Sequence, residues 1–490
     1  MPLLSKEAVQ LSGPRYLGLD LAKRESQISV LDEQGSEVST HRFQTTKENI
    51  LSLASELRPT DTLAPEVTTN AISIARLLKD HSCAKIILSN PIKTKVIAVA
   101  KVKTDKIDAR VLAELARANY LPEVWIPDED TESLRQFFSD RRSLVDRRTE
   151  MKNTVHSILH RNLIVCEQSD LFGVAGRHWL DSLMEKSANE SLHLHKLDRL
   201  RLGSLLKEID RQDLLVADME SIIASYIATR PALRSQLDRL LSIPGVSLIV
   251  GAGVLAAIGD VKRFASAKKL SSYFGLVPTT RQSGDLQARH GRITKTGRSE
   301  VRWLLVEAAE HLRKAPGPLR QLYTRISRKK GRNVAVVAVA RKLAELCWHL
   351  LTKEQDYIYS PPRLTLEKRA RVRFLAKRKL GVKIKSATAR TKSQPALYGT
   401  GLEGRRVKDK IVSLASSHAE QLYQAIVGDK DLNELEHSPD QDNGPTNFDP
   451  TRPRMLEWER ILEQVAANLK VEDLSKRRTK KKSSKEEDKD

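Results

Sequence analysis

Four acidic side chains stand where strands end or a helix begins, and together they could do metal-assisted chemistry. Asp20 ends the apolar run LGLD, and Glu66 closes the run TLAPEV. Asp105 and Asp108 are three residues apart at the start of a periodic helical stretch, so both project from one face. Taken singly, each is explained by a turn or a helix cap. Jointly they fit a two-metal site for phosphoryl transfer, because magnesium prefers hard oxygen ligands.

A hydroxyl nucleophile is the second candidate. Ser283 and Gly284 in RQSG have the composition of a loop, and Thr280 and Ser299 compete with Ser283 for the role. A serine hydroxyl is a weak nucleophile at neutral pH and needs a base or a metal to activate it. The surrounding segment is densely basic, which suits phosphate binding, while a solvated loop and helix face is the alternative. Its basic residues are Arg281, Arg289, His290, Arg292, Lys295, Arg298 and Arg302.

The elements that would position the carboxylates follow the order of a ribonuclease-H-like fold. Three strands in a meander are predicted over residues 15–44, followed by a helix at 46–58 and a strand at 62–67. A helix over AISIARLLKD, a strand at 85–90 and helices from Pro91 complete the pattern. Antiparallel strands followed by alternating helices and strands indicate an α/β catalytic domain, which we place at residues 14–128.

Long helices are predicted after this domain. Residues 129–165 are helical and basic, and Arg141, Arg142, Arg147 and Arg148 lie on a surface that either binds phosphate or is solvated. Over residues 192–228, apolar residues recur at three- and four-residue steps. This pattern indicates a helix that packs against another subunit or forms a hairpin within the chain. The sequence predicts a helical, coiled-coil connector over residues 129–236.

A mainly helical second domain is predicted over residues 237–358, and it begins with a Pro-Gly turn between two apolar helices within 240–260. Residues 359–490 form a basic extension that we predict to be partly disordered. A helix in this extension either contacts RNA or DNA or presents a solvated charged face. Its cations are Lys368, Arg369, Arg371, Arg373, Lys377, Arg378 and Lys379.

Charge and cysteine content restrict the class of protein. The 490 residues include 84 Lys and Arg against 62 Asp and Glu, a formal net charge of +22 that suits a polyanionic partner. Cys83, Cys166 and Cys347 lie far apart in the sequence, so they suggest neither a zinc motif nor a disulfide framework. No targeting segment or long apolar run is present, so we expect a cytoplasmic protein without membrane association.

Several motifs resemble one known family. They are YLGLDLAK (16–23), PEVTTN (65–70), NPIKTKVIAVAKVKTDKIDARVLAELARANYLPEVWIP (90–127), and the block from IPGV (243–246) through FGLVPTTRQSG (274–284) to GRITKTGRSEVRWLLVEAA (291–309). On these residues the chain resembles transposases of the insertion-sequence one-hundred-and-ten group. Members of that group combine an N-terminal RuvC-like DEDD domain with a C-terminal transposase domain.

The resemblance implies roles for individual residues. Asp20, Glu66, Asp105 and Asp108 correspond to the metal-binding set, which would hold Mg²⁺ or Mn²⁺, two ions being expected. Ser283 corresponds to the nucleophile, whose attack on DNA would give a covalent phosphoseryl link. Independently of the resemblance, the dense basic charge of this segment leads us to expect DNA or RNA phosphates at Arg281, Arg292, Lys295, Arg298 and Arg302.

The resemblance also implies partners and a location. A structured noncoding guide (bridge) RNA would pair with DNA, so that base pairing reads the sequence and the protein reads backbone shape. The low aromatic content, 4%, agrees with that division. A homodimer that assembles into a tetramer on DNA, in the nucleoid of a bacterial cytoplasm, is expected. The alternatives are a structure-selective nuclease of the Holliday-junction type that uses only the carboxylates, and a nonenzymatic nucleic-acid-binding protein.

Overall fold

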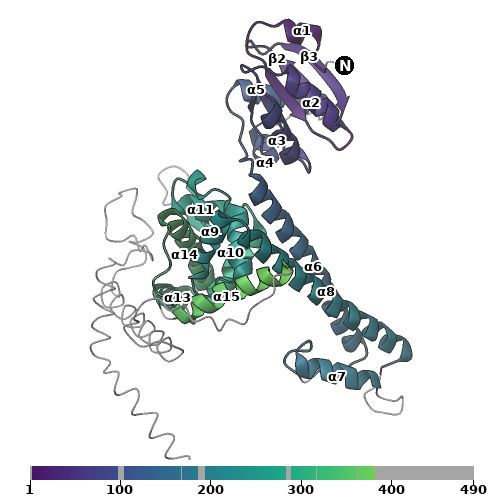
Figure 1. The fold of residues 1–490 in the computed structure, drawn as a ribbon, viewed down its shortest axis with the longest axis vertical. Helices are drawn as coiled ribbons and strands as arrows, with labels where there is room; N and C mark the ends of the chain where they lie inside the picture. The colour runs from purple at the N-terminus through teal and green to yellow at the C-terminus, as the bar shows by residue number, and fades with distance from the viewer. Residues whose placement is uncertain are drawn as a thin grey trace, which may run out of the picture. The chain divides into compact units, whose positions relative to one another are not determined.

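A computed structural model describes residues 3–97, 104–166, 168–185, 194–282, 289–315, 317–360 and 362–380. The chain forms two compact units that divide between Asp130 and Thr131 (Figure 1). Across the described ranges, no helix combines the length and the apolar character needed to cross a membrane. The disorder predicted for much of the basic extension concerns residues outside these ranges.

A five-stranded mixed sheet forms the centre of the first unit. Its strand order is β3-β2-β1-β4-β5, with β1 antiparallel to β2 and parallel to β4. The strands are β1 (Tyr16–Asp20), β2 (Glu25–Leu31), β3 (Glu37–Gln44), β4 (Thr62–Pro65) and β5 (Lys85–Ile86). The helices described in this unit are α1 (Lys6–Gln10), α2 (Lys47–Glu56), α3 (Ala71–His81), α4 (Pro91–Ile97) and α5 (Asp105–Arg117). This mixed α/β architecture is consistent with a ribonuclease-H-like fold.

Helices cover both faces of this sheet. Because side chains alternate along a strand, Leu17 and Leu19 of β1 point to one face, where they share a buried cluster with residues of α2 and α3. Gly18 points to the opposite face and packs directly beneath α5. The central strand β1 is therefore covered on both sides, and α5 is the helix that lies over it.

The second unit is mainly helical. Its long helices are α6 (Glu129–Arg161), whose first two residues belong to the first unit, and α8 (Lys196–Ala228). The other elements are α7 (Val174–Glu185), α9 (Pro231–Leu241), α10 (Leu248–Ile258), η1 (Val261–Arg263), α11 (Ala267–Tyr273), β6 (Pro278–Arg281), β7 (Arg289–Ile293), α12 (Ser299–Leu312), α13 (Pro318–Lys330), α14 (Arg332–Lys353) and α15 (Pro362–Lys379). The predicted separation of a connector from a second domain stays a prediction.

The long helices α6 and α8 are joined by ion pairs and by buried apolar residues. Arg141 of α6 pairs with Glu220 of α8 at 2.7 Å. Arg148 pairs in the same way with Asp213. The basic surface of α6 was expected either to bind phosphate or to be solvated. These two arginines do neither, because each forms an ion pair with a carboxylate of α8. Part of the apolar stripe of α8 is buried within the chain, as for Leu202 in a cluster with α6 and α7. Packing of α8 against another subunit stays a prediction.

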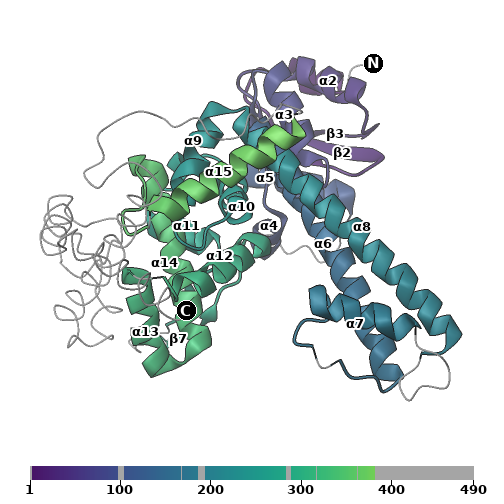
Figure 2. The same ribbon diagram turned by 60° about the horizontal axis from the view of Figure 1, so that its bottom comes forward.

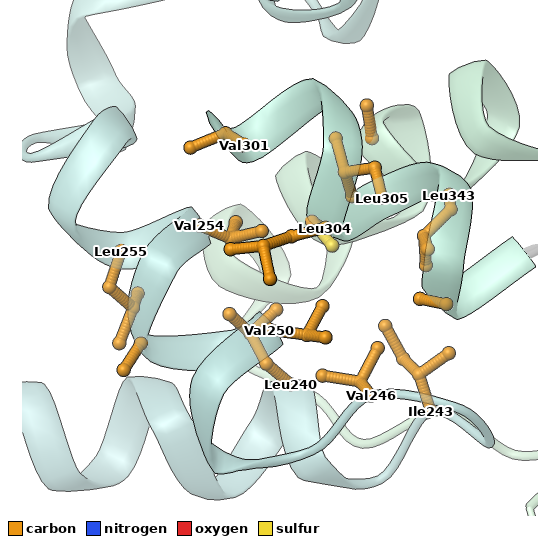
Figure 3. Packing of buried hydrophobic residues seen from close by; sticks show 14 of the residues in the cluster. Leu240, Ile243, Val246, Val250, Val254, Leu255, Val301, Leu304, Leu305 and Leu343 are labelled. Atoms are coloured by element: carbon orange, nitrogen blue, oxygen red, sulfur yellow. The ribbon is translucent and has the colours of Figure 1, made fainter. Parts of the chain in front are cut away.

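The core of the second unit lies around α10. Its sequence, LIVGAGVLAAI, is apolar on every side, which is typical of a helix enclosed by other helices. Figure 3 shows side chains of α9, α10, α12 and α14 pointing toward one another, among them Leu240, Val254, Leu305 and Leu343. The Pro-Gly turn predicted before α10 is present, and Gly245 has a φ of +79°, which a side chain would strain.

We predict unequal reactivity for the cysteines. Burial raises the pKa of Cys347 to about 12, whereas Cys83 is exposed. Because the thiolate is the reactive form, Cys347 stays protonated and inert at pH 8. Iodoacetamide at that pH is expected to modify Cys83 at least about tenfold faster than Cys347 in the native protein, measured by peptide mass spectrometry, and both at similar rates in denaturant. Equal native rates would show that the core around α14 is open.

Candidate catalytic site

Asp20 and Glu66 lie at the same edge of the sheet, at the ends of neighbouring parallel strands. Asp20 is the last residue of β1, and Glu66 directly follows β4. Leu19 stands opposite Pro65 in the register, and the backbone N–H of Glu66 donates to the carbonyl of Leu19 at 3.2 Å. The strand pairing thus places the backbones of the two acidic residues at neighbouring positions.

Both carboxylates belong to the face of the sheet that α5 covers. A Cβ on Gly18 would lie 1.8 Å from the carbonyl oxygen of Ala109 in α5, and Ala64 packs in a cluster with apolar side chains of the same helix. Asp20 and Glu66 are each two residues further along their strands. Since side chains alternate, they extend from the same face as Gly18 and Ala64.

The first turn of α5 lies at that edge because the helix runs antiparallel to β1. At its C-terminal end, Arg117 reaches the carbonyl of Glu33, in the turn after β2, at 3.5 Å. At its N-terminal end, Asp105 accepts a hydrogen bond of 3.2 Å from Arg42, which lies in the same cross-strand row as Asp20. Asp105 and Asp20 therefore share one end of the sheet.

Asp108 belongs to the same first turn of α5 as Asp105. Four residues of helix advance about 6 Å, and two residues of strand advance about 7 Å. The turn that precedes Ala109 therefore lies level with Asp20 when Ala109 lies over Gly18. Even so, among the described residues no group of three or more His, Cys, Asp or Glu side chains gathers closely enough to hold a metal ion. The carboxylates share an edge without closing into a ligand set.

Arg42 is the basic residue of this edge that the sequence did not single out. Its guanidinium bridges Glu25, at 3.2 Å, and Asp105, at 3.2 Å. All three side chains are about half exposed or more, so these ion pairs contribute little to stability. The only sequence signal for Arg42 is its place in the alternation of β3, on the same face as the carboxylates.

The second candidate site is the hairpin of β6 and β7. Ser283 and Gly284 lie outside the described residues, in the connection between these strands. Arg281, the last residue of β6, stands directly opposite Arg289, the first residue of β7. Like charges in opposed positions repel each other across a strand pair. The two ends of the strands that flank the serine are therefore positively charged.

The basic residues predicted around the serine differ in their surroundings. Arg281, Arg292 and Lys295 are exposed, while Arg298 is half-buried at the N-cap of α12. Arg302 donates from Nη1 to two backbone carbonyls at 3.0 Å each, so part of its guanidinium has a structural role. Their contact with nucleic acid stays a prediction.

Two glycines hold the base of the hairpin. Gly275 has a φ of +67°, and a Cβ there would lie 2.4 Å from the carbonyl oxygen of Thr296. Gly297 has a φ of +72°, and its Cβ would lie 2.1 Å from the carbonyl oxygen of Tyr273. The backbone entering β6 and the backbone leaving β7 are therefore in direct contact, which only glycine permits.

Tyr273, at the end of α11, lies beside this base in a positively charged environment. Burial alone would raise the pKa of its hydroxyl. A hydrogen bond from Arg263 and the charges of Arg263, Arg135 and Arg298 outweigh burial, so the pKa of Tyr273 lies below its usual value. The Cζ atom of Arg263 lies 4.6 Å from the centre of the tyrosine ring. This cluster could not be predicted from the sequence, because its members are distant from one another along the chain.

Two protein families match the two parts of the chain. Residues 17–163 match a transposase family named for the DEDD residues of IS110 elements. Residues 237–324 match the family described as Transposase IS116/IS110/IS902. The matches cover the sheet with its acidic edge and the domain that contains the hairpin.

Named relatives agree with these matches. The chain is 24% identical over 359 residues to the transposase for insertion sequence element IS1111A of Coxiella burnetii, covering 72% of this chain and 94% of that one. It is 26% identical to a probable family 20 transposase of Pseudomonas aeruginosa, covering 70% and 98%. It is also 26% identical to the pilin gene-inverting protein of Moraxella bovis, covering 56% and 74%. The chain therefore contains, in order, two transposase domains of the IS110/IS116/IS902 type, and it is similar to transposases, which are DNA-processing enzymes.

Proposed function

We propose that this transposase cleaves and rejoins DNA strands with carboxylates in the first unit and a serine nucleophile in the second. The carboxylates are Asp20, Glu66, Asp105 and Asp108, and the nucleophile is Ser283. The observation that carries the proposal is the common edge at which two neighbouring strands end and the first turn of α5 begins.

The donor chemistry of this edge fits a divalent metal ion such as Mg²⁺ or Mn²⁺. All four side chains are carboxylates, which are the hard oxygen ligands that these ions prefer. A bound ion, or a pair of ions, would stabilise negative charge on the attacking and leaving oxygens of phosphoryl transfer. DNA binding must then bring side chains that now share an edge closer together.

In the proposed reaction, the hydroxyl oxygen of Ser283 attacks a DNA phosphorus and gives up its proton. The bond between phosphorus and the leaving strand oxygen breaks, and that oxygen is protonated as a free hydroxyl. The resulting phosphoseryl ester keeps the phosphate activated, so a hydroxyl of another strand can displace the serine and restore it. Rejoining therefore needs no external energy source.

The opposed arginines of the hairpin support a phosphate close to the serine. Arg281 and Arg289 repel each other in the free protein, and a phosphate between or beside them would offset that repulsion. Ser283 lies two residues beyond Arg281, so a strand phosphate that contacts Arg281 would be near its hydroxyl.

The partners follow from the same proposal. Transposases of this family act on DNA, and we propose that a structured noncoding RNA guides this one to its sites. Dimers would assemble into a tetramer, in which the carboxylates of one subunit and Ser283 of another form a composite site. The excess of 84 basic over 62 acidic residues supports nucleic acids as the main partners.

The test is a search for a covalent link between protein and DNA. With labelled DNA that carries the ends of the mobile element, the wild type is expected to form an adduct that survives denaturing electrophoresis. Ser283→Ala should reduce adduct formation at least about 10³-fold, because no other group supplies the attacking oxygen. Chelation of divalent metal should reduce strand cleavage in the wild type.

Thr280→Val is the matched control, since it removes a neighbouring hydroxyl from β6. An adduct in Ser283→Ala would overturn the serine assignment. Metal-dependent cleavage without any adduct in the wild type would instead indicate a nuclease that uses water and only the carboxylates.

A further inference from the structure

The helix α15 is attached to the second unit through one face. It packs against α8 and α9 (Figure 2). Val372 and Ala376 are buried in the core. The ammonium group of Lys368 donates to the carbonyl oxygens of Ile243, at 2.6 Å, and Val246, at 3.0 Å, in the Pro-Gly turn before α10. These contacts fix which side of α15 faces inward.

Two further cations serve the same attachment. Arg369 donates to the carbonyl oxygen of Asp238 at 2.6 Å and forms an ion pair with Asp356 at 2.8 Å. Lys379 pairs with Asp218 of α8 at 2.7 Å. Three of the seven cations predicted on this helix therefore form hydrogen bonds or ion pairs with the rest of the second unit.

The other four cations point to solvent. Arg371, Arg373, Lys377 and Arg378 are exposed, and no ion pair is recorded for them in the described part of the chain. The segment KRARVRFLAKRK contains no acidic residue that could neutralise them. Phe374 lies among them with 51% of its surface exposed.

Helix geometry places the aromatic ring between cations. Residues three and four apart are neighbours on a helix surface. Arg371 and Arg378 therefore flank Phe374 along one side, while Lys377 lies next to it on the other, with Arg373 beyond. This face, defined by Arg371, Arg373, Phe374, Lys377 and Arg378, combines a stacking platform with positive charge. Grooves that bind single strands have the same combination.

We propose that this face binds single-stranded DNA, with a base stacked on Phe374 and the backbone phosphates held by the four cations. A double helix keeps its bases stacked inside and would leave the ring without a partner. Exchange of DNA strands, which transposition and inversion require, exposes unpaired bases. The inference depends on this family activity alone, so it survives if the serine or metal chemistry proposed above fails.

The stacking part is tested by fluorescence anisotropy with an oligothymidylate of about 15 nucleotides. Phe374→Ala in the full chain is expected to weaken binding roughly 5- to 150-fold, the effect of losing one stacked base. Phe374→Trp should retain wild-type affinity, and duplex DNA should bind both variants as it binds the wild type. Equal loss for duplex and single strand, or no loss for either, would overturn the proposal.

The charge part is tested with a variant in which the four exposed cations become glutamine. For single strands, the slope of log affinity against log salt concentration is expected to become shallower by about 3, because each of the four lost phosphate contacts changes this slope by ~0.7. A matched control removes the same charge from other exposed positions of the second unit, namely Lys314, Arg320, Arg328 and Lys329. A control as weakened as the test variant would assign the effect to net charge and overturn the site.

A parallel binding measurement with RNA tests whether this face binds DNA or RNA. An oligouridylate of the same length is expected to bind this face no more tightly than the oligothymidylate does. If the glutamine variant and Phe374→Ala lose RNA binding but keep DNA binding, the face belongs to an RNA partner, and the assignment to DNA is wrong. Because all the replaced residues are exposed, each variant is expected to keep the wild-type helix content. Circular dichroism checks this.

Discussion

Arg15→Met is expected to destabilise the first unit by about 3–5 kcal/mol, because it leaves a buried carboxylate without its partner. The side chains of Arg15 and Asp61 are both fully buried and form an ion pair of 2.5 Å at the start of β1 and β4. Arg15 also donates to the carbonyls of Ala8 and Glu56, at 2.9 Å each. One guanidinium therefore ties α1, α2 and two strands together.

Hydrogen exchange of β1 and β4 peptides in the full-length protein measures the local loss of stability. Removing both charges, in Arg15→Met with Asp61→Leu, should cost less than either single change, since no unpaired charge remains. Arg110→Ala, which breaks the exposed pair with Glu114, serves as the control and should cost at most about 1 kcal/mol. An Arg15 variant no more harmful than this control would contradict the assignment.

Gly18→Ala is expected to lower strand-cleavage activity about 100-fold, since misplacement of catalytic groups by ~1 Å has an effect of that size. The new Cβ would lie 1.8 Å from the carbonyl oxygen of Ala109 and 2.6 Å from the backbone nitrogen of Ala113. Backbone cannot turn aside as a flexible side chain can, so α5 must move away from β1. Asp105 and Asp108 would then move away from Asp20.

A comparison of cleavage rate with folding separates this effect from simple unfolding. The same change should cost about 1–3 kcal/mol of stability through overpacking, which leaves much of the protein folded. Gly203→Ala is the matched control, because a Cβ there meets only the sulfur of Met184 at 3.7 Å, and alanine favours the interior of α8. Full activity in Gly18→Ala would show that contact between α5 and β1 does not position the carboxylates.

The sheet could be predicted from the sequence because its signals are local. Alternating apolar residues mark β1 to β4, and the turn at Gly35 separates β2 from β3. The strand expected at 85–90 is shorter, as β5 ends at Ile86. Its pairing nevertheless continues, since Ile87 donates to Leu63 and Ser89 donates to Pro65. The presence of β5 could therefore be predicted from the sequence. Its end could not, because the pairing beyond Ile86 is irregular.

Contacts between distant side chains could not be predicted in the same way. The sequence gives Arg15 and Asp61 no special pattern, although they form the most deeply buried ion pair described here. The sequence predicts a basic surface at Arg141 and Arg148, yet their partners lie on α8, 79 and 65 residues away. Such pairings depend on how helices are oriented in three dimensions, which periodicity does not encode.

The candidate site likewise has one part that local sequence signals predict and another that depends on tertiary packing. The positions of Asp20 and Glu66 at one edge follow from strand ends, which a sequence displays. The contact of Asp105 with Arg42 depends on the packing of α5, and Gly18 was the available signal for it. A glycine inside a strand often marks the close approach of another backbone.

The paired glycines at the base of the hairpin have an evolutionary consequence. Gly275 and Gly297 let main-chain atoms touch main-chain atoms, so the contact at the base of the hairpin does not depend on side-chain volume. Core residues of this unit can then be exchanged by mutation over many generations without separating the two ends of the hairpin. Substitutions of the two glycines themselves are not tolerated in this way, because a side chain would clash with the backbone.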